Sequence, residues 1–151
     1  MLKIDIWIFA INPPTQTPWN IIRDDYTQSI LWGKKALAIF HKLEITNNTA
    51  VILIWLAESY QRTGRYEEMN SHIMEAEKII SGLNDYFREA KIYFLKAQYA
   101  LHQKNFSEAI SQIDNSIDKF NLAKNTRWET EILIEKLNIL LEAGIKEKID
   151  P

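Results

Sequence analysis

The residue types that most often carry enzyme or metal chemistry are sparse in this chain. Three histidines are present, at His41, His72 and His102, and none lies at a helical i, i+4 spacing from another. The sequence contains no HExxH motif, no cysteine and no glycine-rich phosphate loop, so it offers neither clustered metal ligands nor a thiolate nucleophile. Glu67 and Glu68 open a helix, where carboxylates complement the helix dipole. We therefore expect no catalytic residues, no metal, no cofactor, and a protein that is not an enzyme.

The size and net charge of the chain limit the classes of partner that it can have. The chain has 151 residues, of which 46% are hydrophobic and 25% charged, a balance typical of one soluble globular domain. Its net charge is −2 and Lys34–Lys35 is its only adjacent basic pair, so nucleic acid is not an expected partner. The longest apolar run, Ala50 to Ala57, is far shorter than the ~20 residues that span a bilayer. The lack of cysteine agrees with a reducing compartment, and we expect a cytoplasmic protein that does not insert into membranes.

An aromatic and small-residue pattern returns every 40 residues and is the strongest signal in the sequence. Tyr26, Tyr66 and Phe106 share one register. A fixed period of this size predicts a solenoid, whose units bury their apolar faces by stacking on one another. The same period relates five further sets: Ser29, Met69 and Ala109; Ala36, Ala76 and Ser116; Leu53, Tyr93 and Leu133; Ala57, Ala97 and Leu137; Tyr60, Ala100 and Leu140.

The pattern predicts six antiparallel helices that must position any binding surface. Residues 18–151 are expected to form the helical repeat domain, and residues 1–17 a non-repeat segment that is either extended or a short helix. Gly64 is expected to take the left-handed conformation that ends a helix, and Gly144 to end the last helix. The expected helices cover residues 18–43 or 26–43, 50–62, 66–80, 85–103, 106–120 and 126–143.

The middle of the chain resembles the tetratricopeptide repeat family. Leu56-Ala57-x-x-Tyr60-x-x-x-Gly64-x-Tyr66 is similar to that family's order of small, aromatic, glycine and aromatic residues, and the likeness covers about residues 24–144. The resemblance implies an all-α fold, a right-handed α-α superhelix of the tetratricopeptide-like kind. The period departs from the family's usual repeat of about 34 residues. The position of Leu56 also changes to lysine in the later units, at Lys96 and Lys136.

In the tetratricopeptide arrangement, the first helix of each unit lines a concave groove. Ile54, Phe94 and Ile134 would form an apolar ladder along this groove, unless they belong to the core. Phe94 lies beside Lys91 and Gln98 at helical spacing, which makes it the best single candidate. Carried over by position, the groove residues are Val51, Ile54, Glu58, Arg62, Lys91, Phe94, Gln98, Leu101, Glu131, Ile134, Asn138 and Leu141.

The resemblance implies a non-catalytic module that binds a peptide or helix of a partner protein in this groove, as an adaptor, chaperone or regulator. The apolar Ile6–Ile11 segment is a further candidate occupant of the groove, in its own chain or in a neighbour. The chain begins and ends on half units, which gives an alternative in which copies stack through those ends into a homo-oligomer. A more distant alternative is a helical ribonuclease, because Arg65 and His72 have a spacing similar to that of such enzymes.

Overall fold

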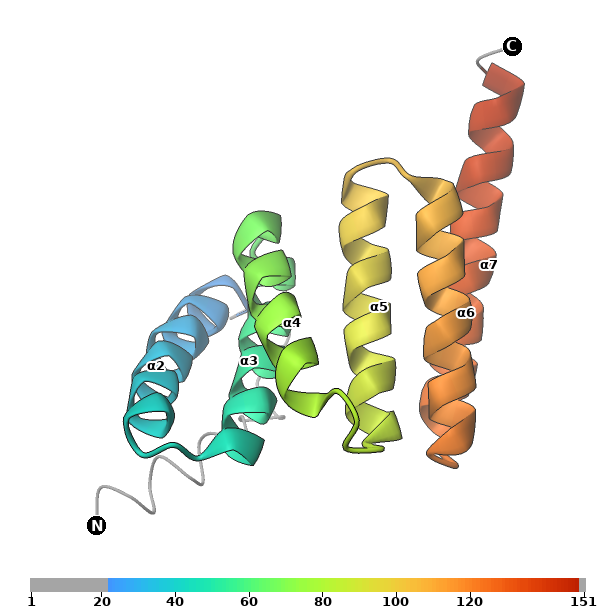
Figure 1. The fold of residues 1–151 in the computed structure, drawn as a ribbon. Coiled ribbons are helices and arrows are strands. Elements are labelled where there is room, and N and C mark those ends of the chain that lie inside the picture. The colour runs from blue at the N-terminus through green and yellow to red at the C-terminus, as the bar shows by residue number, and fades with distance from the viewer. Residues whose placement is uncertain (1–21, 150–151) are drawn as a thin grey trace. The chain divides into compact units, whose positions relative to one another are not determined.

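The computed structural model describes the backbone of residues 22–149 and the side chains of residues 26–144. This part of the chain contains six helices and no strand, which confirms the expected all-α class (Figure 1). The non-repeat segment of residues 1–17 and the alternative start of the first helix at residue 18 lie outside the described residues. The helices are α2 (Ile22–Lys42), α3 (Thr46–Arg62), α4 (Tyr66–Ile80), α5 (Tyr86–His102), α6 (Phe106–Leu122) and α7 (Thr126–Ile149).

The helices begin at a constant spacing. The starts of α3 to α7 are residues 46, 66, 86, 106 and 126, so one helix and its following turn occupy 20 residues and a helical pair occupies 40. The period seen in the side-chain types is therefore also the period of the local backbone structure.

Four of the turns that separate these helices close in the same way. Gly64 has a φ of 73°, and Glu44, Lys104 and Lys124 take the same left-handed conformation, with φ of 55°, 60° and 53°. The residue after each of them donates its N–H to the carbonyl oxygen five residues earlier, at 2.8 to 3.0 Å. This is the six-to-one hydrogen bond of the Schellman motif. The turn expected at Gly64 is confirmed, whereas the other three positions carry side chains that disfavour the left-handed region.

Three of the expected helix ends are wrong by four residues or more. α2 already includes residues 22–25, which precede the alternative start at residue 26. α3 begins at Thr46 rather than Ala50, because the N–H and the hydroxyl of Thr49 both bond to the carbonyl oxygen of Ile45, at 3.1 and 2.7 Å. α7 does not end at Gly144 but continues to Ile149, since a glycine inside a helix costs only about 1 kcal/mol relative to alanine. The expected helix over residues 66–80 agrees with α4.

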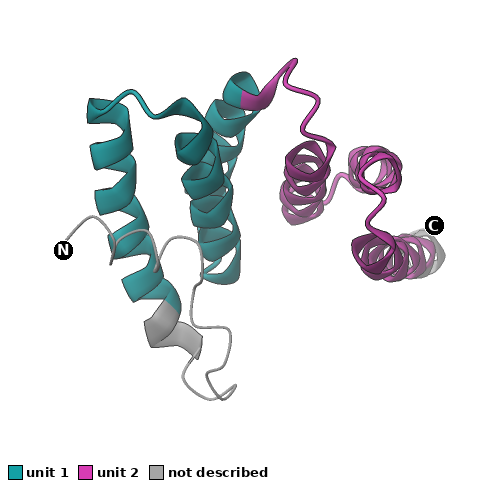
Figure 2. Cartoon of the chain, turned by 90° about the horizontal axis from the view of Figure 1, so that it is seen from below, with its two compact units in different colours: residues 1–79 teal, residues 80–151 magenta. Residues whose placement is uncertain are grey.

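The chain folds into two compact units, unit 1 of residues 1–79 and unit 2 of residues 80–151 (Figure 2). Unit 1 contains α2, α3 and all but the last residue of α4. Within it α2 packs on α3, and Gly33 approaches Leu56 so closely that an added Cβ would lie 2.6 Å from the Leu56 Cδ2 atom. Leu56, Met69 and Ile73 are fully buried.

Unit 2 contains α5, α6 and α7, and α6 packs against both of the other helices. Its core combines the small Ala90 and Ala97 of α5 with Ile113 of α6 and Ile132 of α7, all buried. Alanine lets the α6 backbone approach α5, and the Ser116 hydroxyl uses this proximity to donate to the carbonyl oxygen of Ala90 at 2.8 Å.

Candidate functional site

The four expected groove residues of α3 differ in their exposure. Ile54 is only 4% exposed, Val51 and Glu58 are half-buried, and Arg62 is exposed. Ile54 is therefore a core residue, which was the alternative to a groove residue in the sequence analysis. Because α3 belongs to unit 1 and the remaining groove residues belong to unit 2, the site is built here from unit 2 alone.

Two of the expected groove residues of α5 contact side chains of α7 that lie outside the expected groove set. The Gln98 amide donates from Nε2 to Oε1 of Glu135 on α7, at 2.9 Å. Two helical turns away on each helix, the Lys91 ammonium lies 5.2 Å from the centre of the Trp128 ring. Each contact joins residues 37 apart in sequence, and together they link α5 to α7.

The apolar members of this surface form two rows. Phe94 and Leu101 of α5 are half-buried and pack against the core of unit 2. Ile134 and Leu141 of α7 are each 57% exposed. Both pairs have a spacing of seven residues, which is two helical turns. We name this set, Phe94, Leu101, Ile134 and Leu141, the α5–α7 surface.

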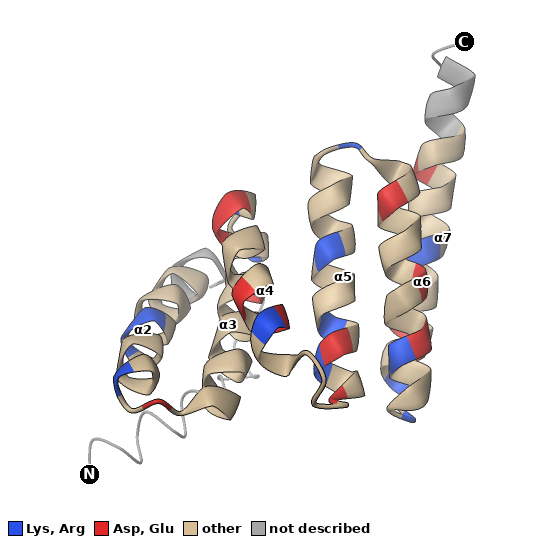
Figure 3. Ribbon diagram, viewed as in Figure 1, with Lys and Arg blue, Asp and Glu red and all other residues tan. Residues whose placement is uncertain are grey.

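The polar members of the expected groove lie around these rows. Asn138 and Glu131 of α7 are exposed, and the Glu131 carboxylate accepts a hydrogen bond of 3.3 Å from Nε of Arg127. Acidic and basic residues are interspersed along α5, α6 and α7 rather than gathered by sign (Figure 3). The chemistry that the α5–α7 surface offers is therefore apolar contact with a few amide and carboxylate groups at its margin.

Charge pairs link α6 to both of its neighbours in unit 2. Lys136 of α7 donates to Asp114 of α6 at 2.5 Å, and Lys119 of α6 forms an ion pair with Glu89 of α5. The hydrogen bond to Glu89 raises the pKa of Lys119 above its ordinary value of 10.5. These partially buried pairs orient the helices without contributing side chains to the α5–α7 surface.

A second apolar row on α7 was not expected to be accessible. Leu133, Leu137 and Leu140 are 48%, 57% and 45% exposed. We name this row the α7 leucine row. Its counterparts one and two periods earlier include Ala57 and Ala97, which are fully buried. The signal in the sequence is the change from alanine to leucine at these positions of the last helix, which shows that the row packs differently from its predecessors.

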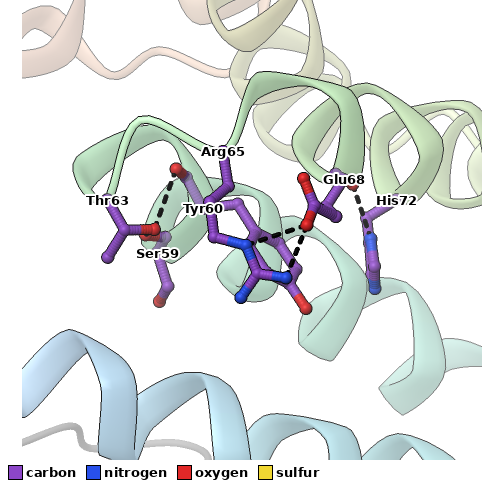
Figure 4. Close-up of polar contacts among 6 residues, drawn as sticks. All are labelled: Ser59, Tyr60, Thr63, Arg65, Glu68 and His72. Atoms are coloured by element: carbon purple, nitrogen blue, oxygen red, sulfur yellow. Dashed lines mark hydrogen bonds and ion pairs between the residues drawn. The ribbon is translucent and has the colours of Figure 1, made fainter.

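The Arg65 and His72 side chains lie together at the α3–α4 turn (Figure 4). Nε of Arg65 donates to Oε1 of Glu68 at 2.8 Å, and the guanidinium carbon lies 4.8 Å from the centre of the Tyr60 ring. Nδ1 of His72 is 2.7 Å from the carbonyl oxygen of Glu68, and its ring centre is 5.1 Å from that of Tyr60. Tyr60 is only 1% exposed, so the cluster covers a buried ring and ties the turn to both helices.

The electrostatics of this cluster follow from its ion pair. The hydrogen bond from Arg65 holds the pKa of Glu68 below its ordinary value of 4.5, with a smaller contribution from a backbone hydrogen bond. The carboxylate thus stays ionised at neutral pH and pairs with the guanidinium. A paired charge of this kind stabilises a turn and leaves the cation less able to bind a phosphate.

Other site types were sought in the part of the chain that the structure describes. There, no three histidine, aspartate or glutamate side chains gather where they could hold a metal ion. No helix among these residues is long and apolar enough to cross a membrane. No known protein family, curated protein or solved structure matches the chain. The tetratricopeptide-like superhelix and its groove stay predictions from the sequence, and function is inferred from the surfaces described above.

Proposed function

We propose that this chain is a non-catalytic, cytoplasmic interaction module with a right-handed, tetratricopeptide-like superhelix, and that it binds an apolar helix or extended peptide of a partner protein. The observation that carries the proposal is the α5–α7 surface, where Ile134 and Leu141 of α7 are exposed and Phe94 and Leu101 of α5 are half-buried. The regular helix spacing of 20 residues and the recurring Schellman turns support the repeat architecture.

The spacing of the apolar side chains fits such a ligand. Helix-in-groove recognition uses anchors at i, i+3, i+4 and i+7 of the ligand, and each row of the α5–α7 surface presents two apolar side chains separated by two turns. The Gln98–Glu135 hydrogen bond lies between α5 and α7 and holds them side by side. An acidic or carboxylate-terminated ligand fits less well, because this surface carries no cluster of basic side chains among its described residues (Figure 3).

The contacts at the α3–α4 turn favour the interaction module over the ribonuclease alternative. A ribonuclease would need Arg65 available for a phosphate and His72 positioned for proton transfer. Instead the guanidinium is paired with Glu68 and stacked on Tyr60, and the His72 ring is bonded to a backbone carbonyl. Both side chains thus have structural roles that need no substrate.

The proposal is tested by selecting peptides on the immobilised protein from a phage-displayed random library and measuring the affinity of the enriched peptides. Ile134→Glu should weaken their binding by about tenfold or more, because burying such a side chain contributes about 1.5–3 kcal/mol. Leu122→Glu is the matched control, since Leu122 is also 57% exposed but lies at the end of α6. Failure to enrich any peptide, or equal binding to both variants, would contradict the proposal.

A further inference from the structure

The α7 leucine row places three exposed apolar side chains on one face of a described helix. In unit 2 the same positions of α5, one period earlier, are covered by α6. Ala97 and Ala100 are 0% and 4% exposed and pack in one cluster with Ile113 of α6. The residues equivalent to these two alanines are Leu137 and Leu140, and on α7 no described helix takes the place that α6 takes on α5.

The α2 helix of unit 1 packs on fewer described helices than its equivalent in unit 2. By the 40-residue register α2 corresponds to α6, which packs against both α5 and α7. By contrast, α3 is the one described helix of unit 1 against which α2 packs extensively. Its Trp32 and Ile39 remain 47% and 39% exposed.

The register also identifies the surfaces that these exposed residues would meet. Trp32 corresponds to His72 of α4, whose ring contacts Tyr60 of the preceding helix. The residue equivalent to Tyr60 on α7 is Leu140. By analogy with the α3–α4 unit, α2 packed on α7 would place Trp32 against Leu140.

A second pair follows from α5 and α6. Ile39 corresponds to Lys119 of α6, which forms an ion pair with Glu89, one helical turn before Tyr93 on α5. The residue equivalent to Tyr93 is Leu133, which is 48% exposed. The equivalent positions of α4 and α3, Ile79 and Leu53, are likewise aliphatic, as expected for an apolar contact.

A matching apolar face favours α2 as the helix that covers the α7 leucine row. Trp32 and Ile39 of α2, and Leu43 directly after it, are 47%, 39% and 49% exposed, and their spacings of seven and four residues place them on one helix face. Packing this face on the α7 leucine row would remove both sets of apolar side chains from water. A helix from an unrelated protein would have no reason to carry apolar side chains in the same 40-residue register.

We propose that α2 of a second copy of this chain packs on the α7 leucine row, in the place that α6 takes on α5. The contact is head to tail, because it joins different surfaces of the two copies. It uses a different face of α7 from the α5–α7 surface, so it does not depend on the peptide-binding function.

The first test is the mass of the protein in solution. By sedimentation velocity, the average mass of the wild type should rise with concentration. Leu137→Glu and Trp32→Glu should each give monomers, whereas Leu122→Glu, the control of equal exposure, should behave as wild type. An equimolar mixture of Leu137→Glu and Trp32→Glu should form a dimer of one copy of each, because one intact α7 row and one intact α2 remain. A wild type that stays monomeric, or a mixture that forms no dimer, would overturn the proposal.

The second test fixes the register and uses the absence of cysteine from the sequence. Trp32→Cys and Leu140→Cys should form a mixed disulfide on oxidation at least tenfold faster than Leu122→Cys and Leu140→Cys do. Circular dichroism of each variant shows whether its helices are retained. Faster formation of a Leu140→Cys homodimer would mean that two α7 helices pack together and would overturn the head-to-tail contact. Because neither test involves a peptide, its failure is distinct from failure of the peptide-binding function.

Discussion

Gly33 offers a direct test of the packing between α2 and α3. A Cβ added there would lie 2.6 Å from Cδ2 and 2.9 Å from Cγ of Leu56, and 3.4 Å from Cζ3 of Trp55. The first two distances are well below ordinary van der Waals contact, and Leu56 is fully buried, so its side chain has little space into which to move. Gly33→Ala should therefore force α2 and α3 apart.

The magnitude is the difference between two effects of opposite sign. Replacing glycine by alanine inside a helix gains about 1 kcal/mol in helix propensity. Overpacking a filled core costs about 1–3 kcal/mol, and two contacts below 3 Å on a fully buried side chain place Gly33→Ala toward the upper part of that range. We expect a net destabilisation of about 1–2 kcal/mol.

Gly144→Ala is the matched control, because Gly144 also lies inside a helix but an added Cβ there would meet no atom within 4 Å. This variant should be stabilised by up to about 1 kcal/mol. Urea denaturation followed by circular dichroism gives both free energies of unfolding, with an unchanged denaturant slope as the sign that only stability has changed. Equal stability of the two variants would show that the close approach of Gly33 to Leu56 is absent, and would refute the reasoning.

Three further substitutions test the turns and the core. Gly64→Ala should destabilise the protein by about 1 kcal/mol in the same urea assay, because alanine is strained in the left-handed region. A steric clash does not contribute, since the added Cβ would meet no atom within 4 Å. Arg65 lowers the pKa of Glu68, so this carboxylate stabilises the fold above its unfolded pKa and loses that contribution as the pH falls through its folded pKa. Glu68→Gln should therefore lose less stability than the wild type when the pH is lowered below 4.5. The free energy of unfolding measured at a series of acidic pH values should fall in Glu67→Gln as in the wild type, and should fall less in Glu68→Gln. Ser116→Ala should cost about 0.5–1 kcal/mol by thermal unfolding, because it removes the hydroxyl that bonds to a buried carbonyl oxygen of α5; no loss would mean that this bond is replaced.

The sequence predicted the helices best where the side-chain pattern and the turn chemistry agree. Tyr66 begins the regular pattern of α4 directly after Gly64, and the expected bounds of that helix match the observed ones. The start of α3 was wrong because its first turn is Thr46-Asn47-Asn48-Thr49, residue types that favour loops. The turn before it depends on Glu44 in the left-handed conformation, and residue type gives no indication of that.

The surfaces were harder to predict than the helices. Helical periodicity places a residue on a face but does not say which neighbour covers that face. Ile54 and Ile134 occupy equivalent positions, yet one is 4% exposed and the other 57%. The leucines of α7 likewise fall in the same register as buried alanines. Their accessibility depends on which helix packs beside α7, and that is a property of the tertiary structure.

The two proposals are connected through α3. In unit 1 α2 packs on α3, and in unit 2 α6 packs on α7. If α2 of a second copy packs on α7 as α6 packs on α5, then α3 of that copy takes the position relative to α7 that α7 has relative to α5. The α5–α7 surface would then continue onto α3 of the next copy, and Val51, half-buried in the chain alone, would border it.

This continuity predicts coupling between peptide binding and assembly. A peptide that contacts α7 of one copy and α3 of the next would bind the assembled form more tightly, and it must then promote assembly by the same factor. Adding such a peptide should raise the average mass of the wild type in sedimentation velocity but not that of Leu137→Glu. If the peptide binds without changing the mass of the wild type, the α5–α7 surface acts within a single copy, and the two faces of α7 work independently.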